Sequence, residues 1–162
     1  MLASGLNRLI VRAAREEDLV AALALLEWER SKNPWLKRTG EILRESIGKP
    51  KSEHRVCIAE RDGEIVGFGV YGFVSGTVGS GSIESILVAP RSRRAGIGHR
   101  ILEHAIADLA SRRARVVFAE IPADAAIVRY RALLLSYGFS EETRIDDYYR
   151  DELPQVIARL DL

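Results

Sequence analysis

The chain has 162 residues, of which 47% are apolar, and its 24 lysines and arginines nearly balance 23 aspartates and glutamates. This composition excludes a disordered tail and a low-complexity segment, and the formal net charge of +1 gives no long-range field that would attract nucleic acid or an anionic membrane. A chain of this length buries roughly 70% of its unfolded surface, so we expect residues 1–162 to form a single domain.

The single cysteine and the absence of long apolar runs indicate in which cellular compartment the protein resides. Cys57 lies in the apolar run Val56-Cys57-Ile58, which favours a buried side chain over a nucleophile and fits a reducing environment. The first nine residues do not resemble a signal peptide, and no run of about 18 apolar residues occurs. We therefore expect a cytoplasmic protein that does not contact membranes.

The N-terminal third predicts one strand and two helices. Residues 9–11 form a short apolar run, and over residues 15–30 the leucines at 19, 23 and 26 fall on one helical face. A second helix is expected over residues 39–47, with Thr39 as its N-cap and Gly48 beyond its end.

The middle of the chain predicts three strands. Residues 55–60 and 64–73 are rich in β-formers and flank Arg61-Asp62-Gly63, a hairpin turn in which the glycine can take a positive φ. The glycine- and serine-rich residues 76–82 predict a loop, and residues 83–88 predict the third strand, which Pro90 ends.

The last part of the chain returns to alternating helices and strands. From Gly96 the apolar residues follow a strong helical period to Leu109, and residues 116–121 then predict a strand. We expect a helix over residues 124–137, stopped by Gly138, and a final strand at 156–160. The complete order predicts a mixed α/β sheet with helices on its faces.

Two motif matches do not carry function. Residues 67–72 match the pattern G-x-G-x-x-G, but they lie within a predicted strand rather than between a strand and a helix, so the glycines are expected to make room for a neighbouring backbone. His99, Glu103 and His104 stand on one helix, but His104 is rotated away from the other two and the H-E-x-x-H spacing is absent. We interpret both histidines as surface residues and expect no metal site.

The most informative segment is the basic turn between the strand at 83–88 and the helix that begins at Gly96. Such a turn presents several backbone N–H groups beside the positive end of the helix dipole, which suits a phosphate or pyrophosphate. Gly96 and Gly98 let an anion approach the backbone, and arginines 91, 93, 94 and 100 surround the helix start. No Lys-Ser/Thr follows the glycines, so the turn is expected to hold an anion without hydrolysing it.

The motif Arg93-x-x-Gly96-x-Gly98, after Leu87-Val88-Ala89-Pro90 and before the long helix, resembles the acyl-CoA signature of the GNAT superfamily of N-acetyltransferases. The resemblance extends over nearly the whole chain. It implies a mixed, mostly antiparallel central sheet of six to seven strands flanked by about four helices, with acetyl-CoA as cosubstrate. It also implies a cosubstrate site on the strand and turn, formed by Ile86, Leu87, Val88, Arg93, Arg94, Ala95, Gly96, Ile97 and Gly98.

Attack on a thioester requires a neutral amine, whereas a lysine amine is neutral in only about one part in 2,500 at pH 7. A general base is therefore needed, and two glutamates are candidates. Glu84 lies on the strand that leads into the signature, and Glu120 lies at the end of the next strand, where related N-terminal acetyltransferases carry a glutamate. The backbone N–H of Val88 is a candidate donor to the oxyanion of the tetrahedral intermediate.

The general acid is where the chain departs from the family pattern. The family commonly has a tyrosine four residues before its Gly-Phe pair, but here that position is Leu134, and Asp124 replaces the usual asparagine. Tyr130, one helical turn earlier, is the replacement that we favour, with Tyr137 as the alternative. If neither reaches the sulfur, the thiolate can leave without an acid, because a thiol pKa of about 8.5 permits it.

The acceptor side offers weaker signals. Tyr148-Tyr149 resembles the C-terminal pattern of enzymes that acetylate protein N-termini, ribosomal proteins among them, and could line an acceptor groove in a loop. Trp28 and Trp35 stand where the family's acceptor site is usually lined, although core packing is the interpretation that we favour for them. We expect direct acetyl transfer to a small-molecule or peptide amine, by a monomer or homodimer. The alternatives are a CoA-binding regulatory or interaction module and a nucleic-acid-binding protein, the latter disfavoured by the balanced charge.

Overall fold

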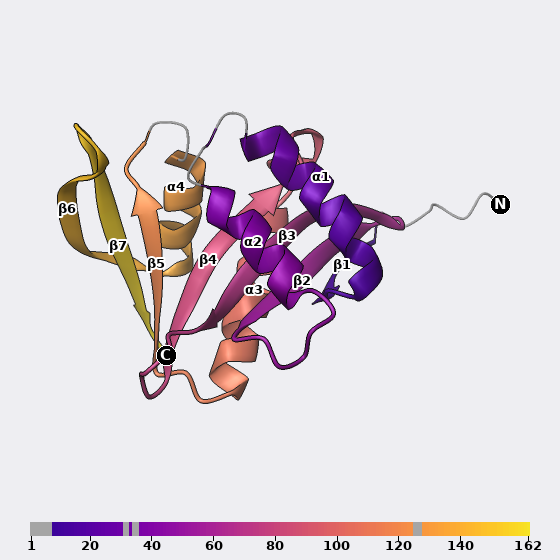
Figure 1. Ribbon diagram of the computed structural model, residues 1–162, viewed down its shortest axis with the longest axis horizontal. Coiled ribbons are helices and arrows are strands. Elements are labelled where there is room, and N and C mark those ends of the chain that lie inside the picture. The colour runs from indigo at the N-terminus through magenta and orange to yellow at the C-terminus, as the bar shows by residue number, and fades with distance from the viewer. Residues whose placement is uncertain (1–7, 31–32, 34–35, 125–127) are drawn as a thin grey trace.

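The computed structural model describes residues 8–30, 33, 36–124 and 128–162, and it shows a seven-stranded sheet between two pairs of helices (Figure 1). The strands lie in the order β1-β2-β3-β4-β5-β7-β6, and every neighbouring pair is antiparallel except β4 with β5. The predicted mixed, mostly antiparallel sheet is therefore confirmed. The strands are β1 (Leu9–Ala13), β2 (His54–Arg61), β3 (Glu64–Phe73), β4 (Ser80–Val88), β5 (Val116–Pro122), β6 (Ser140–Arg150) and β7 (Leu153–Asp161).

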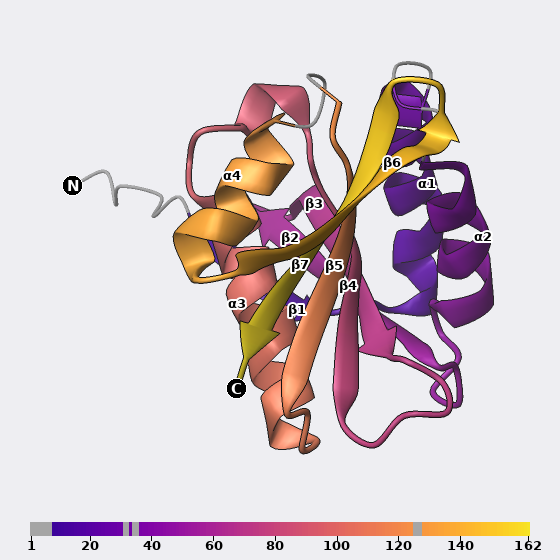
Figure 2. The same ribbon diagram turned by 90° about the vertical axis from the view of Figure 1, so that its left-hand side faces the viewer.

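The helices cover the two faces of the sheet in pairs. Figure 2 shows α1 (Leu19–Arg30) and α2 (Lys37–Ser46) on one face, and α3 (Ile97–Ser111) and α4 (Val128–Tyr137) on the other. Each face has its own buried apolar cluster, one centred on Leu43 and Phe68 and the other on Ile101 and Leu109. None of the described helices is long and apolar enough to cross a membrane.

Three predicted boundaries were wrong. The second helix begins at Lys37 with Leu36 as its N-cap, because Thr39 lies in the first turn, where its buried hydroxyl donates to Ser85 Oγ of β4 at 3.4 Å. Asp124 lies outside any helix, and the described part of α4 begins at Val128. The first helix, expected over residues 15–30, begins with a short 3-10 helix, Glu16–Asp18, and is α-helical only from Leu19.

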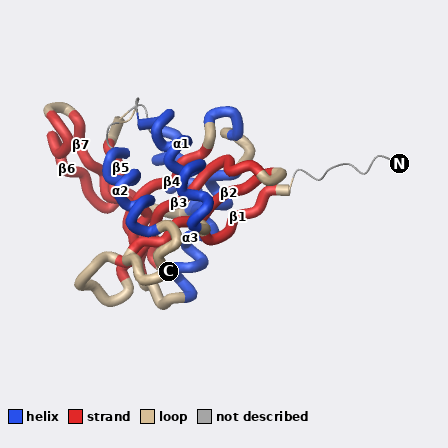
Figure 3. The backbone as a smooth tube through the Cα atoms, turned by 45° about the vertical axis from the view of Figure 1, so that its right-hand side comes forward, coloured by secondary structure: helices blue, strands red, loops and turns tan. Residues whose placement is uncertain are grey.

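The C-terminal strands also differ from the prediction. Residues 156–160 are only the middle of β7, and the preceding residues form β6, which places Tyr148 and Tyr149 in a strand rather than a loop. Nearly all of β6 is exposed, so it has no alternation of apolar and polar residues to predict a strand. Figure 3 shows the β6–β7 hairpin at the end of the sheet opposite β1.

The glycines of β3 are required by close packing, as predicted for the false dinucleotide motif. A Cβ at Gly69 would lie 2.5 Å from Ile101 Cγ2 of α3, and a Cβ at Gly67 would lie 2.7 Å from the Leu87 carbonyl oxygen. Helix α3 can therefore approach the middle of the sheet, and its N-terminus meets the end of β4.

A buried ion pair ties the first strand to the start of the first helix. Arg12 of β1 donates to both carboxylate oxygens of Asp18, at 2.7 and 3.0 Å, and also contacts Glu60 of β2 at 2.9 Å. The Arg12 guanidinium holds the pKa of the Asp18 carboxyl below its usual range. Because the folded-state pKa is lowered, this stabilisation is present above about pH 4 and is lost as the pH falls further.

We expect Asp18→Asn to lower the free energy of unfolding by about 1.5–3 kcal/mol at pH 7, and the difference from wild type to shrink below about pH 4. Urea unfolding at several pH values measures both effects. Asp146→Asn, which removes an exposed pair with Arg144, is the control and should cost less than about 1 kcal/mol. A constant Asp18→Asn deficit between pH 7 and pH 2.5 would contradict the assignment.

Candidate functional site

The central feature of the site is a gap between the two parallel strands. β4 pairs with β5 only from Ser80 to Ile83, opposite residues 116–119, and the strands then separate. Residues 85–88 of β4 keep their partners on the β3 side, and residues 84–88 have none on the β5 side. A strand edge with unpaired N–H and C=O groups is therefore open inside the protein, where an extended ligand can pair with it.

A β-bulge at Glu84 begins the separation. In the β3–β4 register Val70 pairs with Ser85 and Tyr71 pairs with Ile83, so Glu84 has no partner. A bulge increases the local twist and redirects the side chain of the extra residue. On the other side of the gap β5 ends at Pro122, which has no N–H with which to pair.

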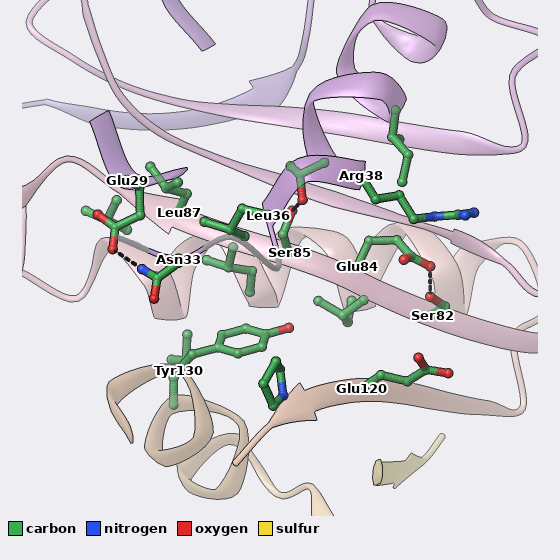
Figure 4. A pocket seen from close by; sticks show the side chains of 18 of the residues that line it. Glu29, Asn33, Leu36, Arg38, Ser82, Glu84, Ser85, Leu87, Glu120 and Tyr130 are labelled. Atoms are coloured by element: carbon green, nitrogen blue, oxygen red, sulfur yellow. Dashed lines mark hydrogen bonds between the residues drawn. The ribbon is translucent and has the colours of Figure 1, made fainter. Parts of the chain in front are cut away.

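A cavity of about 960 Å³ extends through this gap, as Figure 4 shows from close by. One end reaches the N-terminal turn of α3, and the middle lies along residues 82–88 of β4. The other end is bordered by β5 and by β6. Residues from α1, the segment after it, and α2 also line the wall, including Glu29, Asn33, Leu36, Arg38, Thr39 and Ile42.

The turn at the start of α3 has the backbone geometry of an anion site. Arg94 and Gly96 have φ values of 66° and 73°, and no side chain caps the helix at Gly96. The first N–H groups of α3 therefore lack a side-chain partner, and they stand at the positive end of the helix dipole. A Cβ at Gly96 would meet nothing within 4 Å, so the space in front of the backbone is open.

The arginines around this turn have different roles. Arg93 Nε donates to the Val88 carbonyl at 3.0 Å, and its Nη2 donates to Glu29 Oε2 of α1 at 2.8 Å, so Arg93 holds the turn in place. Arg91 pairs with Glu64 of β3, and Arg100 lies 3.9 Å from Glu103. Arg94 is exposed and lines the cavity, so its charge faces the space in front of the turn.

Both predicted base candidates line the cavity. Glu84 accepts a hydrogen bond from Ser82, and its carboxylate lies 3.7 Å from His54 Nε2. Glu120 of β5 accepts a hydrogen bond from Gln155 Nε2 at 2.9 Å. Figure 4 shows the two carboxylates on opposite sides of the gap, one on β4 and one on β5.

Tyr130 points from α4 into the cavity between these strands (Figure 4). Its hydroxyl oxygen is buried and has no hydrogen-bond partner within the described part of the chain. Burial and the negative charge of Glu84 raise the pKa of Tyr130 well above its ordinary value, so the phenol stays protonated at neutral pH. Tyr137 does not line the cavity, and instead packs against His99 and Phe139.

The remaining sequence candidates divide between the cavity and the rest of the protein. Tyr148 and Tyr149 line the cavity from β6, with their rings 4.9 Å apart in an edge-on contact. Trp28 is half exposed and does not line the cavity, and Trp35 lies outside the described residues. Cys57 is fully buried as predicted, and burial raises the pKa of its thiol to about 12, so it cannot serve as a nucleophile at neutral pH.

His99 is exposed and also borders the cavity at the start of α3. Among the residues that the structure describes, no three histidine, cysteine or carboxylate side chains gather as a possible metal site.

Several cavity residues were not anticipated. Glu29 and Asn33 come from α1 and the segment after it, and the Asn33-Pro34 pair signals only the end of a helix in the sequence. Gln155 of β7 bridges Glu120 and the Tyr149 hydroxyl, which lies 3.4 Å from its Nε2. No sequence signal marks these residues, because they meet only when distant segments fold together.

The comparisons with known proteins agree with this geometry. The model of the acetyltransferase (GNAT) family matches residues 10–133. The chain belongs to this family. The comparison with curated protein sequences returns no match.

Solved structures of the same fold cover nearly all of the chain. A GNAT-family protein from Desulfovibrio desulfuricans is 22% identical with a TM-score of 0.83, and the match covers 95% of this chain and 99% of that one. The ribosomal-protein-alanine N-acetyltransferase of Brucella melitensis is 26% identical with a TM-score of 0.71, over 94% and 99%. A Salmonella typhimurium protein solved with its cofactor acetyl-CoA is 17% identical with a TM-score of 0.72, over 96% and 95%.

Proposed function

We propose that this protein is an N-acetyltransferase that transfers the acetyl group of acetyl-CoA directly to a primary amine. The observation that carries the proposal is the continuity of one cavity from the uncapped N-terminus of α3, along the open edge of β4, to the carboxylates of Glu84 and Glu120. The structure of the Salmonella typhimurium protein with acetyl-CoA supports the choice of cosubstrate. A cytoplasmic location remains a prediction of the sequence.

Acetyl-CoA fits the polar groups of this cavity. Its pyrophosphate would be held by the backbone N–H groups of residues 94–98, with the Arg94 side chain nearby, since the Arg93 N–H already donates to the Pro90 carbonyl. The Ala89 N–H donates to Val66 of β3, and successive N–H groups of a strand face opposite edges, so those of Val88 and Ile86 face the gap. They can pair with the extended pantetheine arm as a further strand would.

The transfer forms a C–N bond to the acetyl carbon and breaks the C–S bond. The amine nitrogen loses a proton to a glutamate, directly or through a water molecule, and the departing sulfur gains a proton. The Tyr130 hydroxyl is the proton donor that we assign, because it is protonated, points into the cavity and has no competing partner in the structure. The cavity runs from the turn beside Val88 toward Glu84, so the Ile86 N–H, rather than that of Val88, is the donor that we assign to the oxyanion developing on the acetyl oxygen, and the Val88 N–H is left to the pantetheine arm.

Either glutamate can act as the base. Glu84 is redirected by the bulge, lies beside the open edge of β4 and is close enough to Tyr130 to influence its pKa. Glu120 faces the gap from β5 and is oriented by Gln155. Both positions support base catalysis, and pH profiles of single variants can separate them.

The acceptor enters, in this proposal, at the end of the cavity between α2 and β6. Tyr148 and Tyr149 of β6 provide aromatic surface there. The similar Brucella melitensis protein is named a ribosomal-protein-alanine N-acetyltransferase, so a peptide that begins with alanine is a suitable first acceptor to test. An α-amine has a pKa of about 7.7–8.0, so it needs the base less than a lysine amine does.

A thiol-release assay with acetyl-CoA tests the proposed function across peptides, polyamines, amino acids and aminoglycosides. We expect release that depends on one of these amines, with the acetyl group found on its nitrogen. Acetyl-CoA that stabilises the protein without thiol release toward any amine would instead favour a CoA-binding module.

Replacing Gly98 tests the cosubstrate end of the cavity. A Cβ at Gly98 would lie 3.2 Å from Leu133 Cδ2, so Gly98→Val places new methyl groups between α3 and α4 at the cavity wall. We expect the acetyl-CoA dissociation constant, measured by calorimetry, to rise by at least about tenfold, which is roughly 1.4 kcal/mol. Gly98→Ala should have a smaller effect, and unchanged affinity in the valine variant would refute the assignment of this turn.

Replacing each glutamate by glutamine separates the two bases. The variant that has lost the base should lose about 10²–10⁴-fold in kcat/KM and also the decline of kcat/KM on the acidic side of the pH profile. The other variant should keep that decline. If both variants retain it together with near-wild-type rates, neither glutamate is the base.

Tyr130→Phe is expected to move stability and activity in opposite directions. Loss of a buried hydroxyl without a partner should leave the free energy of unfolding unchanged or raise it by about 1 kcal/mol. The value of kcat should fall by about 10²-fold, because the leaving sulfur loses its proton donor. Tyr137→Phe is the matched control, since Tyr137 lies outside the cavity. Equal kcat values for Tyr130→Phe and the wild type would exclude the role.

A further inference from the structure

Asn33 is a buried polar residue that the mechanism above does not use. It lies just after α1, is only 4% exposed, and lines the cavity beside Leu87 (Figure 4). Its side-chain oxygen, Oδ1, is buried and has no hydrogen-bond partner among the residues that the structure describes. Buried amide oxygens are normally paired, so this one is ready to accept a hydrogen bond from a molecule in the cavity.

The hydrogen bond to Glu29 fixes the orientation of the Asn33 side-chain amide. Its Nδ2 donates to Glu29 Oε1 at 2.8 Å. A carboxylate can only accept hydrogen bonds, so the nitrogen must face Glu29 and the oxygen must face the other way. Figure 4 shows the oxygen directed into the cavity. Two backbone bonds hold the residue itself, from Asn33 N to the Glu29 carbonyl at 3.0 Å and from Leu36 N to the Asn33 carbonyl at 3.1 Å.

Glu29 is in turn held by the signature turn. Its second carboxylate oxygen accepts from Arg93, whose Nε donates to the Val88 carbonyl. The Glu29 side chain is 15% exposed and that of Arg93 is 30% exposed, so the ion pair is partly shielded from water and salt. The network therefore runs from the Val88 carbonyl through Arg93 and Glu29 to the unpaired oxygen of Asn33, and it couples the face of the sheet that carries α1 to the cosubstrate turn.

We propose that Asn33 Oδ1 is a substrate-binding group that accepts an N–H hydrogen bond from a molecule bound in the cavity. The inference rests on the proposed function, which supplies two N–H sources. One is the reacting amine, which Asn33 would orient from the α1 face of the sheet. The other is an amide N–H of the pantetheine arm. Because the Val88 carbonyl already accepts from Arg93, Asn33 Oδ1 would take its place as the acceptor for that N–H.

The test compares Asn33→Ala with Ser46→Ala in two measurements. Ser46 is also buried and loses a side-chain bond, to Ser52 at 2.9 Å, but it lies outside the cavity. Calorimetry gives the dissociation constant of acetyl-CoA, and the thiol-release assay with an alanine-initiated peptide gives the KM of the amine. Thermal unfolding of both variants confirms that they are folded at the assay temperature.

We expect Asn33→Ala to raise either the acetyl-CoA dissociation constant or the KM of the amine by about 3- to 10-fold, the usual range for a single hydrogen bond. Ser46→Ala should change neither constant. An increased acetyl-CoA dissociation constant identifies the pantetheine arm as the source, and an increased amine KM identifies the amine. Wild-type values of both constants in Asn33→Ala overturn the inference. Wild-type protein that binds acetyl-CoA but acetylates no amine refutes the proposed function, and the calorimetric comparison then decides on Asn33 alone.

Glu29→Gln provides a second test that keeps the size of the side chain. A glutamine can donate as well as accept, so it no longer forces the Asn33 nitrogen to face it. We expect a smaller increase in the same constant that Asn33→Ala raises. Because Glu29 also accepts from Arg93, the acetyl-CoA dissociation constant can rise as well; no increase in the constant that Asn33→Ala raises would contradict the positioning role of Glu29.

Discussion

The site depends on the separation of β4 from β5 after only four paired positions. A parallel pair that continued to the end of β4 would use every N–H and C=O of residues 84–88 and would leave no cavity. The bulge at Glu84 and the proline at the end of β5 prevent that continuation. The unpaired edge that results is enclosed by helices on both faces of the sheet, so it is open to a slender ligand rather than to another protein strand.

The signature arginine acts inside the protein. Arg93 binds the Val88 carbonyl and the Glu29 carboxylate, and so joins the end of β4, the basic turn and α1. Backbone N–H groups and Arg94 are left to face an anion. A near-neutral chain can therefore hold a highly charged cosubstrate, because the required positive potential comes from a helix terminus and a few local groups rather than from the net charge.

The sequence was sufficient to predict elements with strong periodicity, namely α3, the β2–β3 hairpin and the strand that ends in the signature. It did not predict β6, whose exposed and highly charged residues lack an alternating pattern. The bulge at Glu84 and the bond between Thr39 and Ser85 depend on register and tertiary packing, which no local pattern encodes. In the sequence, Asn33 and Pro34 indicate only the end of a helix. The role of Asn33 depends on its contact with Glu29 and on the contact of Glu29 with Arg93, and both contacts exist only in the folded protein.

Amide hydrogen exchange with and without acetyl-CoA, followed by NMR at Ile86 and Val88, tests the central claim most directly. If the open edge of β4 binds the pantetheine arm, these two N–H groups become protected when acetyl-CoA is added, whereas Ala89, already bonded to Val66 of β3, changes little. Binding of acetyl-CoA that leaves the exchange of Ile86 and Val88 unchanged would contradict the account.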